Sequence, residues 1–129
     1  MQRRFEVGVQ SYSFRHFLDN EVVARKVRAL GLRQLELCAV HADFSRPETL
    51  GEISAIYARA GVSIVSLGVQ TFKGEAAEER WFHSAQAGGA KHISAHFEIG
   101  SFAAAIPRVR AWCRQYGIRV GIHCHGGYP

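Results

Sequence analysis

One pattern constrains this chain more than any other: an amphipathic helix, a glycine and a short β-rich run, repeated in tandem. Four copies read ALGLRQLELC (29–38), RAGVSIVSLG (59–68), AGGAKHISAH (87–96) and QYGIRVGIHC (115–124). Their glycines at 31, 61, 89 and 117 are spaced by 30, 28 and 28 residues. Glycine directly after a helix supplies the left-handed conformation that closes it, and a spacing near 30 is the length of one β/α unit. The pattern therefore predicts alternating helices and strands.

Apolar spacing places the helices between these strands. Val23, Val27 and Leu30 fall on one face of the first expected helix, and the third, residues 75–87, is less regular. Pro47 and Pro107 suit first-turn positions, where a missing N–H is harmless. An alternating segment precedes the first helix. We therefore expect five strands, near residues 6–12, 33–38, 62–68, 91–96 and 118–123.

Strands joined through helices run parallel with right-handed crossovers, either in a barrel or in an open doubly wound sheet. No GxGxxG or GxxxxGK[ST] pattern stands at a strand–helix junction, which weakens the open nucleotide-binding sheet. A closed barrel needs about 200–250 residues, so five strands cannot close one. The chain could be a fragment, a half completed by a second copy, or an open sheet. We expect an α/β fold, one domain over 1–129 that is the five-strand N-terminal portion of an eight-stranded barrel.

Composition indicates an ordinary globular protein. Hydrophobic residues make up 47% of the chain, and no apolar run approaches the length of a membrane span. The charged N-terminus is unlike a signal peptide, and three widely spaced cysteines indicate no disulfide framework, so we expect a cytoplasmic protein. The net charge of +5 comes from basic residues scattered along the sequence. A solvated surface explains them better than a nucleic-acid partner, and we expect no membrane partner.

Residues that carry chemistry cluster at the predicted carboxyl ends of the strands, where parallel β/α folds place their active sites. They are Gln10, Ser11, Tyr12, Glu36, Cys38, His41, Ser66, Gln70, His96, Glu98, His123 and His125. Imidazoles and carboxylates converging on one rim suit a divalent metal site or an acid–base pair. Glu36 interrupts an apolar run, so it should be buried and needs a partner. His96 could equally be a histidine bonded to backbone, and the H-x-H of His123 and His125 is weak evidence by itself.

Three segments carry a resemblance to a known family. They are VGVQSYSFR (7–15), QLEL (34–37) ending near His41, and above all YGIRVGIHCHGG (116–127). The chain resembles the sugar phosphate isomerase/epimerase group of the xylose isomerase-like TIM barrel superfamily, in which the last stretch usually has asparagine where Cys124 stands. The resemblance implies a closed barrel with a divalent metal (Mn²⁺, Mg²⁺, Co²⁺ or Zn²⁺) that stabilises an enediolate of a sugar or keto-polyol while acidic residues move a proton.

Carried over to this sequence, the resemblance implies a role for each candidate. His123 occupies the place of a fifth-strand metal ligand, and the remaining ligands would come from strands six to eight. Glu36 and His96 are the candidate catalytic residues. Tyr12, His41 and His125 are the candidate substrate-binding residues.

Two other functions stay open. An AP endonuclease of the same superfamily would bind a zinc cluster and abasic DNA, and the basic balance mildly favours it, but that group uses more histidines and glutamates than this chain offers. A non-catalytic half-barrel that binds or oligomerises would suit the short length. Because the outer strands and the inner face would lack partners, we also expect a homo-oligomer.

Overall fold

The computed structural model describes residues 5–124. Its strands are β1 (Gly8–Gln10), β2 (Gln34–Leu37), β3 (Ser63–Phe72), β4 (His92–Phe97) and β5 (Arg119–Ile122). Its α-helices are α1 (Asn20–Ala29), α2 (Pro47–Arg59), α3 (Arg80–Gly88) and α4 (Phe102–Tyr116). Two 3₁₀ turns, η1 (Ser11–Phe14) and η2 (Ala76–Glu79), follow β1 and precede α3. Every expected strand is present, and β3 runs four residues beyond its predicted end.

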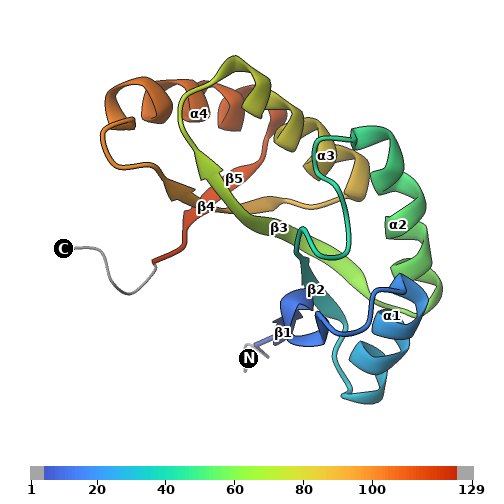
Figure 1. The fold of residues 1–129 in the computed structure, drawn as a ribbon. Helices are drawn as coiled ribbons and strands as arrows, with labels where there is room; N and C mark the ends of the chain where they lie inside the picture. The colour runs from blue at the N-terminus through green and yellow to red at the C-terminus, as the bar shows by residue number, and fades with distance from the viewer. Residues whose placement is uncertain (1–4, 125–129) are drawn as a thin grey trace, which may run out of the picture.

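The strands form one sheet in the order β1-β2-β3-β4-β5, and every neighbouring pair is parallel. In Figure 1 the helices follow one another along one side of this sheet, from α1 to α4. The opposite side, called the open face here, carries no helix of the described residues. This confirms the predicted fold class, parallel β/α units arranged as the first five strands of a barrel.

The glycines of the repeat do what the pattern predicts. Gly31, Gly61, Gly89 and Gly117 have φ of 77°, 75°, 77° and 64°. Each lies within two residues of a helix end, where a left-handed residue turns the chain back into the sheet, and L side chains rarely adopt that conformation. The helix starts are supported as well: the Asp19 side chain accepts a hydrogen bond from the Glu21 N–H, and Pro47 opens α2.

Two expectations about the helices are wrong. Pro107 lies inside α4 rather than in its first turn, because α4 begins earlier, at Phe102. The proline therefore removes the N–H that would otherwise bond the carbonyl of Ala103, four residues before it. Leu30 is 63% exposed, because α1 ends at Ala29 and Leu30 lies in the turn beyond the packed face.

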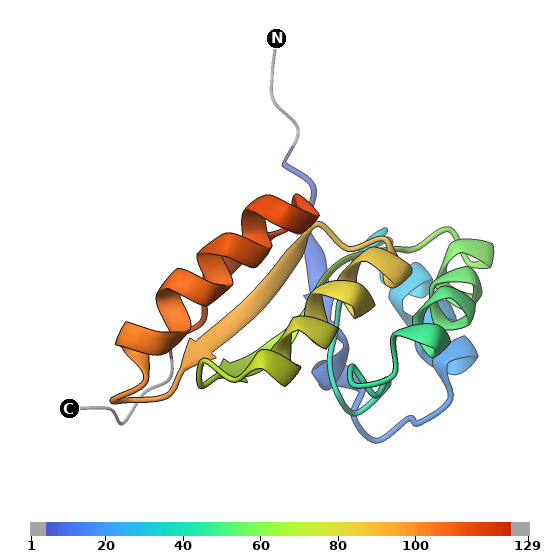
Figure 2. The same cartoon turned by 90° about the horizontal axis from the view of Figure 1, so that it is seen from above.

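The core lies between the sheet and the helices. Strand residues that alternate toward the helices are fully buried, among them Leu35, Leu37 and Ile93. Aromatic rings fill the space under α3 and α4, with centroid distances of 5.0 Å from Phe72 to Trp81 and 5.6 Å from Phe82 to Trp112. Figure 2 shows α3 and α4 on either side of β4. None of the helices in residues 5–124 is long and apolar enough to cross a membrane.

Candidate functional site

Glu36 of β2 lies on the open face and accepts hydrogen bonds from three side chains. Gln10 Nε2 donates to Glu36 Oε1 at 2.6 Å, and Ser66 Oγ donates to Glu36 Oε2 at 2.6 Å. Ser94 Oγ donates to the same Oε2 atom. We call Gln10, Glu36, Ser66 and Ser94 the carboxylate layer. It joins four neighbouring strands through one acidic side chain, which is the partner set that an acid within an apolar run requires.

Strand alternation explains why these residues meet. Leu35 and Leu37 are buried against the helices, so Glu36 between them points to the open face. The register pairs Gln10 with Glu36 and Glu36 with Ser66. Gly68 then leaves room for the last donor, because a Cβ there would lie 2.7 Å from Ser94 Cβ.

Two of the histidines expected on the rim lie far from β1: His96 is on β4, and His123 directly follows β5. His96 lies on β4 two residues after Ser94, on the same face by alternation, and the His123 N–H donates to the carbonyl of Ala95 at 2.8 Å. His96 and His123 both line a groove of about 840 Å³ between α4 and the β5 edge. The structure therefore brings these two candidates together.

The same groove is otherwise mostly apolar. Large side chains on its border are exposed: Ile99 by 62%, Ile106 by 51% and Ile122 by 72%. Cys113 lines it too, and burial raises the pKa of that thiol. The predicted homo-oligomer is compatible with this uncovered surface and stays a prediction.

His41 belongs to a different, buried group. Its Nδ1 lies 2.9 Å from Ser11 Oγ, and its Nε2 lies 2.9 Å from the carbonyl oxygen of Phe17. The Cys38 N–H donates to Ser11 Oγ at 2.9 Å. Since a carbonyl only accepts, His41 Nε2 donates to Phe17, while the Ser11 hydroxyl donates to Cys38 Sγ at 3.1 Å. We call Ser11, Cys38 and His41 the buried loop network.

Two further side chains extend this network to the helices. Asn20 Nδ2 donates to the carbonyl of His41 at 2.9 Å, and the Tyr57 hydroxyl donates to Asn20 Oδ1 at 2.7 Å. Burial, with a smaller contribution from Cys38, raises the pKa of Tyr57 well above its ordinary value. His41 is only 5% exposed and both ring nitrogens are occupied, so in this arrangement it holds the loops that follow β1 and β2. A direct contact with substrate stays a prediction.

Of the two remaining candidates, the structure describes Tyr12 but not His125. Tyr12 is 51% exposed in η1, and the guanidinium carbon of Arg15 lies 4.9 Å from its ring centroid. His125 lies outside the described residues. Within residues 5–124, no group of three or more His, Cys, Asp or Glu side chains is placed to hold a metal ion. The described residues therefore do not form a complete metal site.

Sequence reasoning missed Ser94 and the link between Ser11 and His41. The alternation of His92, Ser94 and His96 along β4 would have placed Ser94 on the open face. No pattern in the sequence indicates the second, because Ser11 and His41 are 30 residues apart and follow different strands.

Comparison with known proteins identifies the fold. No protein-family model and no curated protein matches the sequence. An uncharacterised protein from Parabacteroides distasonis matches 94% of this chain with a TM-score of 0.78 and 17% identity. A sugar phosphate isomerase/epimerase from the same organism matches 96% with a TM-score of 0.67 and 16% identity. A xylose isomerase-like TIM barrel/4-hydroxyphenylpyruvate dioxygenase fusion protein matches 89% with a TM-score of 0.62 and 14% identity.

The chain spans only part of each of these structures. It covers 53% and 56% of the two Parabacteroides proteins and 21% of the fusion protein. Within that part the strand order and the one-sided helices agree with a portion of a β/α barrel. The chain therefore has the fold of a portion of a β/α barrel, five strands long.

Proposed function

We propose that this chain supplies part of the active site of a sugar or keto-polyol isomerase or epimerase, which moves a proton through an enediolate. The observation that carries the proposal is the carboxylate layer on the open face, with His96 next to it along β4. Similarity of fold to a protein described as a sugar phosphate isomerase/epimerase supports the same chemistry. The substrate is a small molecule with neighbouring carbonyl and hydroxyl groups.

Glu36 and His96 have complementary roles in this proposal. Glu36 Oε1 accepts one protein hydrogen bond while Oε2 accepts two, which leaves Oε1 able to accept a second one from a substrate hydroxyl. Its fixed position orients that hydroxyl. An imidazole both accepts and donates a proton near neutral pH, so His96 transfers the proton next to the carbonyl. Tyr12 and His125 contact the rest of the substrate.

The metal of the proposal is a divalent ion, and His123 supplies one ligand to it. Residues 5–124 do not form a complete metal site, so further ligands would have to come from outside this part. No step above passes through the metal.

Solvent exchange tests the proposal directly. The chain, or a longer protein that contains it, is incubated in D₂O with ketose phosphates and keto-polyols, with Mn²⁺, Mg²⁺, Co²⁺ or Zn²⁺ added in turn. NMR then follows deuterium entering the carbon beside the carbonyl. We expect exchange, and a loss of about 100-fold or more in His96→Asn, the lower end of what a general acid–base group contributes.

His92→Asn is the matched control, because His92 lies on the same strand and face but at the opposite end. It should leave the exchange rate unchanged. His123→Ala should weaken metal affinity by about 10-fold or more. Removing a residue that only hydrogen-bonds to a metal ligand already costs about 10-fold, and removing the ligand itself should cost at least as much. Absence of exchange with every metal, or equal losses in both asparagine variants, would contradict the proposal.

A further inference from the structure

A row of basic side chains lies at the edge of the sheet where the strands begin, opposite to the candidate site. Arg33 directly precedes β2, Lys91 directly precedes β4, and His92 and Arg119 are the first residues of β4 and β5. All four side chains are exposed. We call these four residues the cationic edge. These basic residues are far apart in the sequence, and the fold brings them to one edge.

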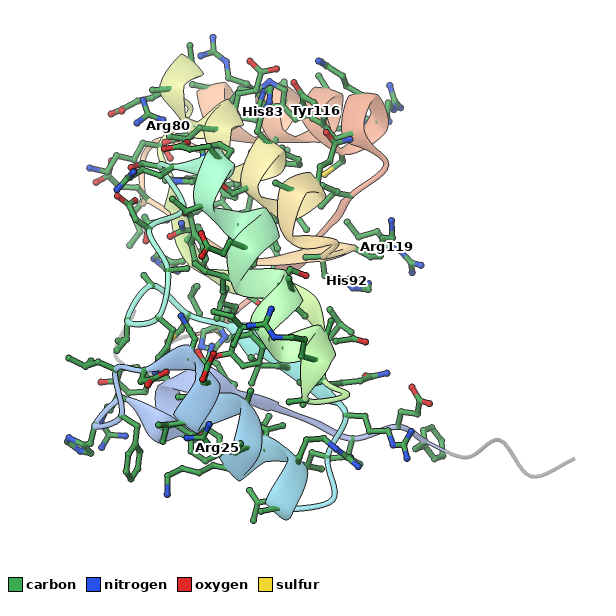
Figure 3. All side chains as sticks on the ribbon, turned by 90° about the vertical axis from the view of Figure 1, so that its right-hand side faces the viewer. Arg25, Arg80, His83, His92, Tyr116 and Arg119 are labelled. Atoms are coloured by element: carbon green, nitrogen blue, oxygen red, sulfur yellow. The ribbon has the colours of Figure 1, made fainter. Side chains whose placement is uncertain are left out.

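The cations stand at the starts of β2, β4 and β5, and Ser63 stands at the start of β3 between them. His92 is the register partner of Arg119, and the Arg119 N–H donates to the carbonyl of Lys91 at 3.0 Å. The Lys91 N–H donates to Val65 of β3, while the carbonyl of Arg33 accepts from Ser63, at the start of β3. Adjacent strands lie about 4.8 Å apart. Figure 3 shows His92 and Arg119 side by side, both pointing away from the ribbon.

These cations are not neutralised within the part of the chain that the structure describes. The ion pairs there join Arg25 and Arg59 to Glu21, Arg46 to Glu48, and Lys73 to Glu98. Arg33, Lys91 and Arg119 form none. Glu6 contributes one carboxylate near this edge, where it is bonded to the side chain of Gln34.

Helix dipoles do not account for the row. Cations in a last helical turn stabilise the negative end of the helix, which explains Lys26, Arg28 and Arg59 in α1 and α2. The residues of the cationic edge lie at the starts of strands instead. A stabilising role toward the helices therefore leaves these positions unexplained.

The surface around the row suits a polyanion with regularly spaced charges. The turns before β2, β4 and β5 contain Gly31, Gly89 and Gly117, and a Cβ built at any of these meets nothing within 4 Å. Gln34 begins β2 and Ser63 begins β3, so polar side chains lie between Arg33 and Lys91. Glutamine and serine side chains hydrogen-bond well to phosphate oxygens. Exposed apolar side chains, Phe5, Val7 and Leu30, lie in the segments beside Arg33, so binding to a lipid surface is the alternative that the test below separates from binding to a polyanion in solution.

We propose that the cationic edge binds the phosphate backbone of a nucleic acid, without reading its sequence. Arg33, Lys91 and Arg119 contact successive phosphates, and His92 donates a hydrogen bond between them. A duplex presents regularly spaced phosphates whatever its sequence, so duplex DNA is the appropriate probe. The surface is on the opposite end of the strands from Glu36 and His96, so this binding is independent of the proposed isomerase activity.

Fluorescence anisotropy with a labelled 20-base-pair DNA duplex tests this proposal. We expect a Kd of about 10⁻⁴–10⁻⁶ M at physiological salt, the range of non-specific binding. Three phosphate contacts predict a slope of log K against log salt of about −2.7. The triple variant Arg33→Gln, Lys91→Gln, Arg119→Gln should lose at least tenfold in affinity and most of that slope.

The triple variant Arg108→Gln, Arg110→Gln, Arg114→Gln is the control. It removes the same charge from exposed positions of α4 and should bind like the parent chain. Equal losses in both triple variants would mean that net charge alone attracts the DNA, and would overturn the proposal. So would tighter binding to phosphatidylserine vesicles than to DNA through the same three residues.

A second measurement needs no substitution. The chain has three lysines, Lys26, Lys73 and Lys91. Acylation of amines followed by mass spectrometry should show that DNA protects Lys91 at least threefold while the other two react as before. Equal protection of all three, or of none, would overturn the proposal.

Discussion

The buried loop network and the carboxylate layer are neighbouring polar clusters with opposite properties. Ser11 is fully buried and His41 is 5% exposed, and every polar atom at their contact is bonded to protein. Glu36, Gln10 and Ser94 are half-buried on the open face, where water or a substrate can reach them. A closed polar cluster holds loops in place, whereas an accessible one can also bind. The difference depends on access rather than on residue type, since both clusters contain serine.

The largest loss of stability is expected from a substitution in the buried loop network. Ser11→Ala leaves the buried Cys38 N–H without its partner and leaves His41 Nδ1 with only the Cys38 sulfur, 3.7 Å away, and an unpaired buried group costs about 1–3 kcal/mol. We expect the free energy of unfolding to fall by about 3 kcal/mol in urea titrations. Ser94→Ala in the carboxylate layer should lose less than about 1 kcal/mol, because water can replace its hydroxyl. Equal losses in the two variants would refute the distinction between the clusters.

A smaller effect tests the packing beneath the carboxylate layer. A Cβ at Gly68 would lie 2.7 Å from Ser94 Cβ and 2.9 Å from its carbonyl oxygen. Gly68→Ala should therefore destabilise the fold by about 2 kcal/mol, within the range for overpacking, and displace Ser94 from Glu36. Gly121→Ala on β5 is the control, because a Cβ there meets nothing within 4 Å. If Gly68→Ala unfolds at the same urea concentration as Gly121→Ala, the close approach is wrong.

Alkaline pH should weaken the closed cluster in particular. The pKa of Tyr57 is raised by burial, so the folded state keeps its proton where the unfolded chain, with a pKa of about 10, has lost it. Stability contributed by this group is present below pH 10 and falls above it, by about 1.4 kcal/mol per pH unit. Urea unfolding at pH 8 and pH 11 measures the loss.

Tyr57→Phe separates this ionisation from that of other groups. This variant lacks the hydrogen bond to Asn20, so its free energy of unfolding at neutral pH should be lower by about 1 kcal/mol. It has no phenol that could ionise at alkaline pH. Its stability should therefore fall less between pH 8 and pH 11 than that of the parent chain. An identical fall would show that Tyr57 does not govern the alkaline loss.

The smallest effect on stability is expected from a substitution of Glu36 in the carboxylate layer. Glu36→Gln keeps one oxygen acceptor for the buried Ser66, and the half-buried Gln10 and Ser94 can turn to water, so the free energy of unfolding should change by less than about 1 kcal/mol. The exchange rate in D₂O should nevertheless fall by about 10-fold or more, as a charged partner of the substrate is lost. A loss of stability above about 3 kcal/mol would make Glu36 structural, like Ser11.

Much of the fold could be predicted because its causes are local. The glycines that close the helices have the same conformation in every copy, so the repeat located four of the five strands, and the alternating segment before the first helix located β1. Pro107 shows the limit of local reasoning. Proline is favoured in the first turn of a helix, where its missing N–H would have no partner in the helix. Here Ala105 and Val109, on either side of Pro107, pack against the core and keep α4 helical.

The candidate site was less predictable, because it depends on which strands become neighbours. Glu36 could be predicted to need partners from its position in an apolar run, but Gln10, Ser66 and Ser94 lie 26, 30 and 58 residues away from it. His41 follows a strand like the other candidates, yet the Phe17 carbonyl and Ser11 turn its ring into a buried contact.

The sequence by itself determined the alternation of helices and strands, the parallel sheet and the face to which Glu36 points. These follow from glycine conformation and from the twofold period of a strand, and both act over a few residues. Only the tertiary structure decided which polar groups are enclosed and which remain accessible. It also collected Arg33, Lys91, His92 and Arg119 on one edge, because register places residues from separate β/α units beside one another.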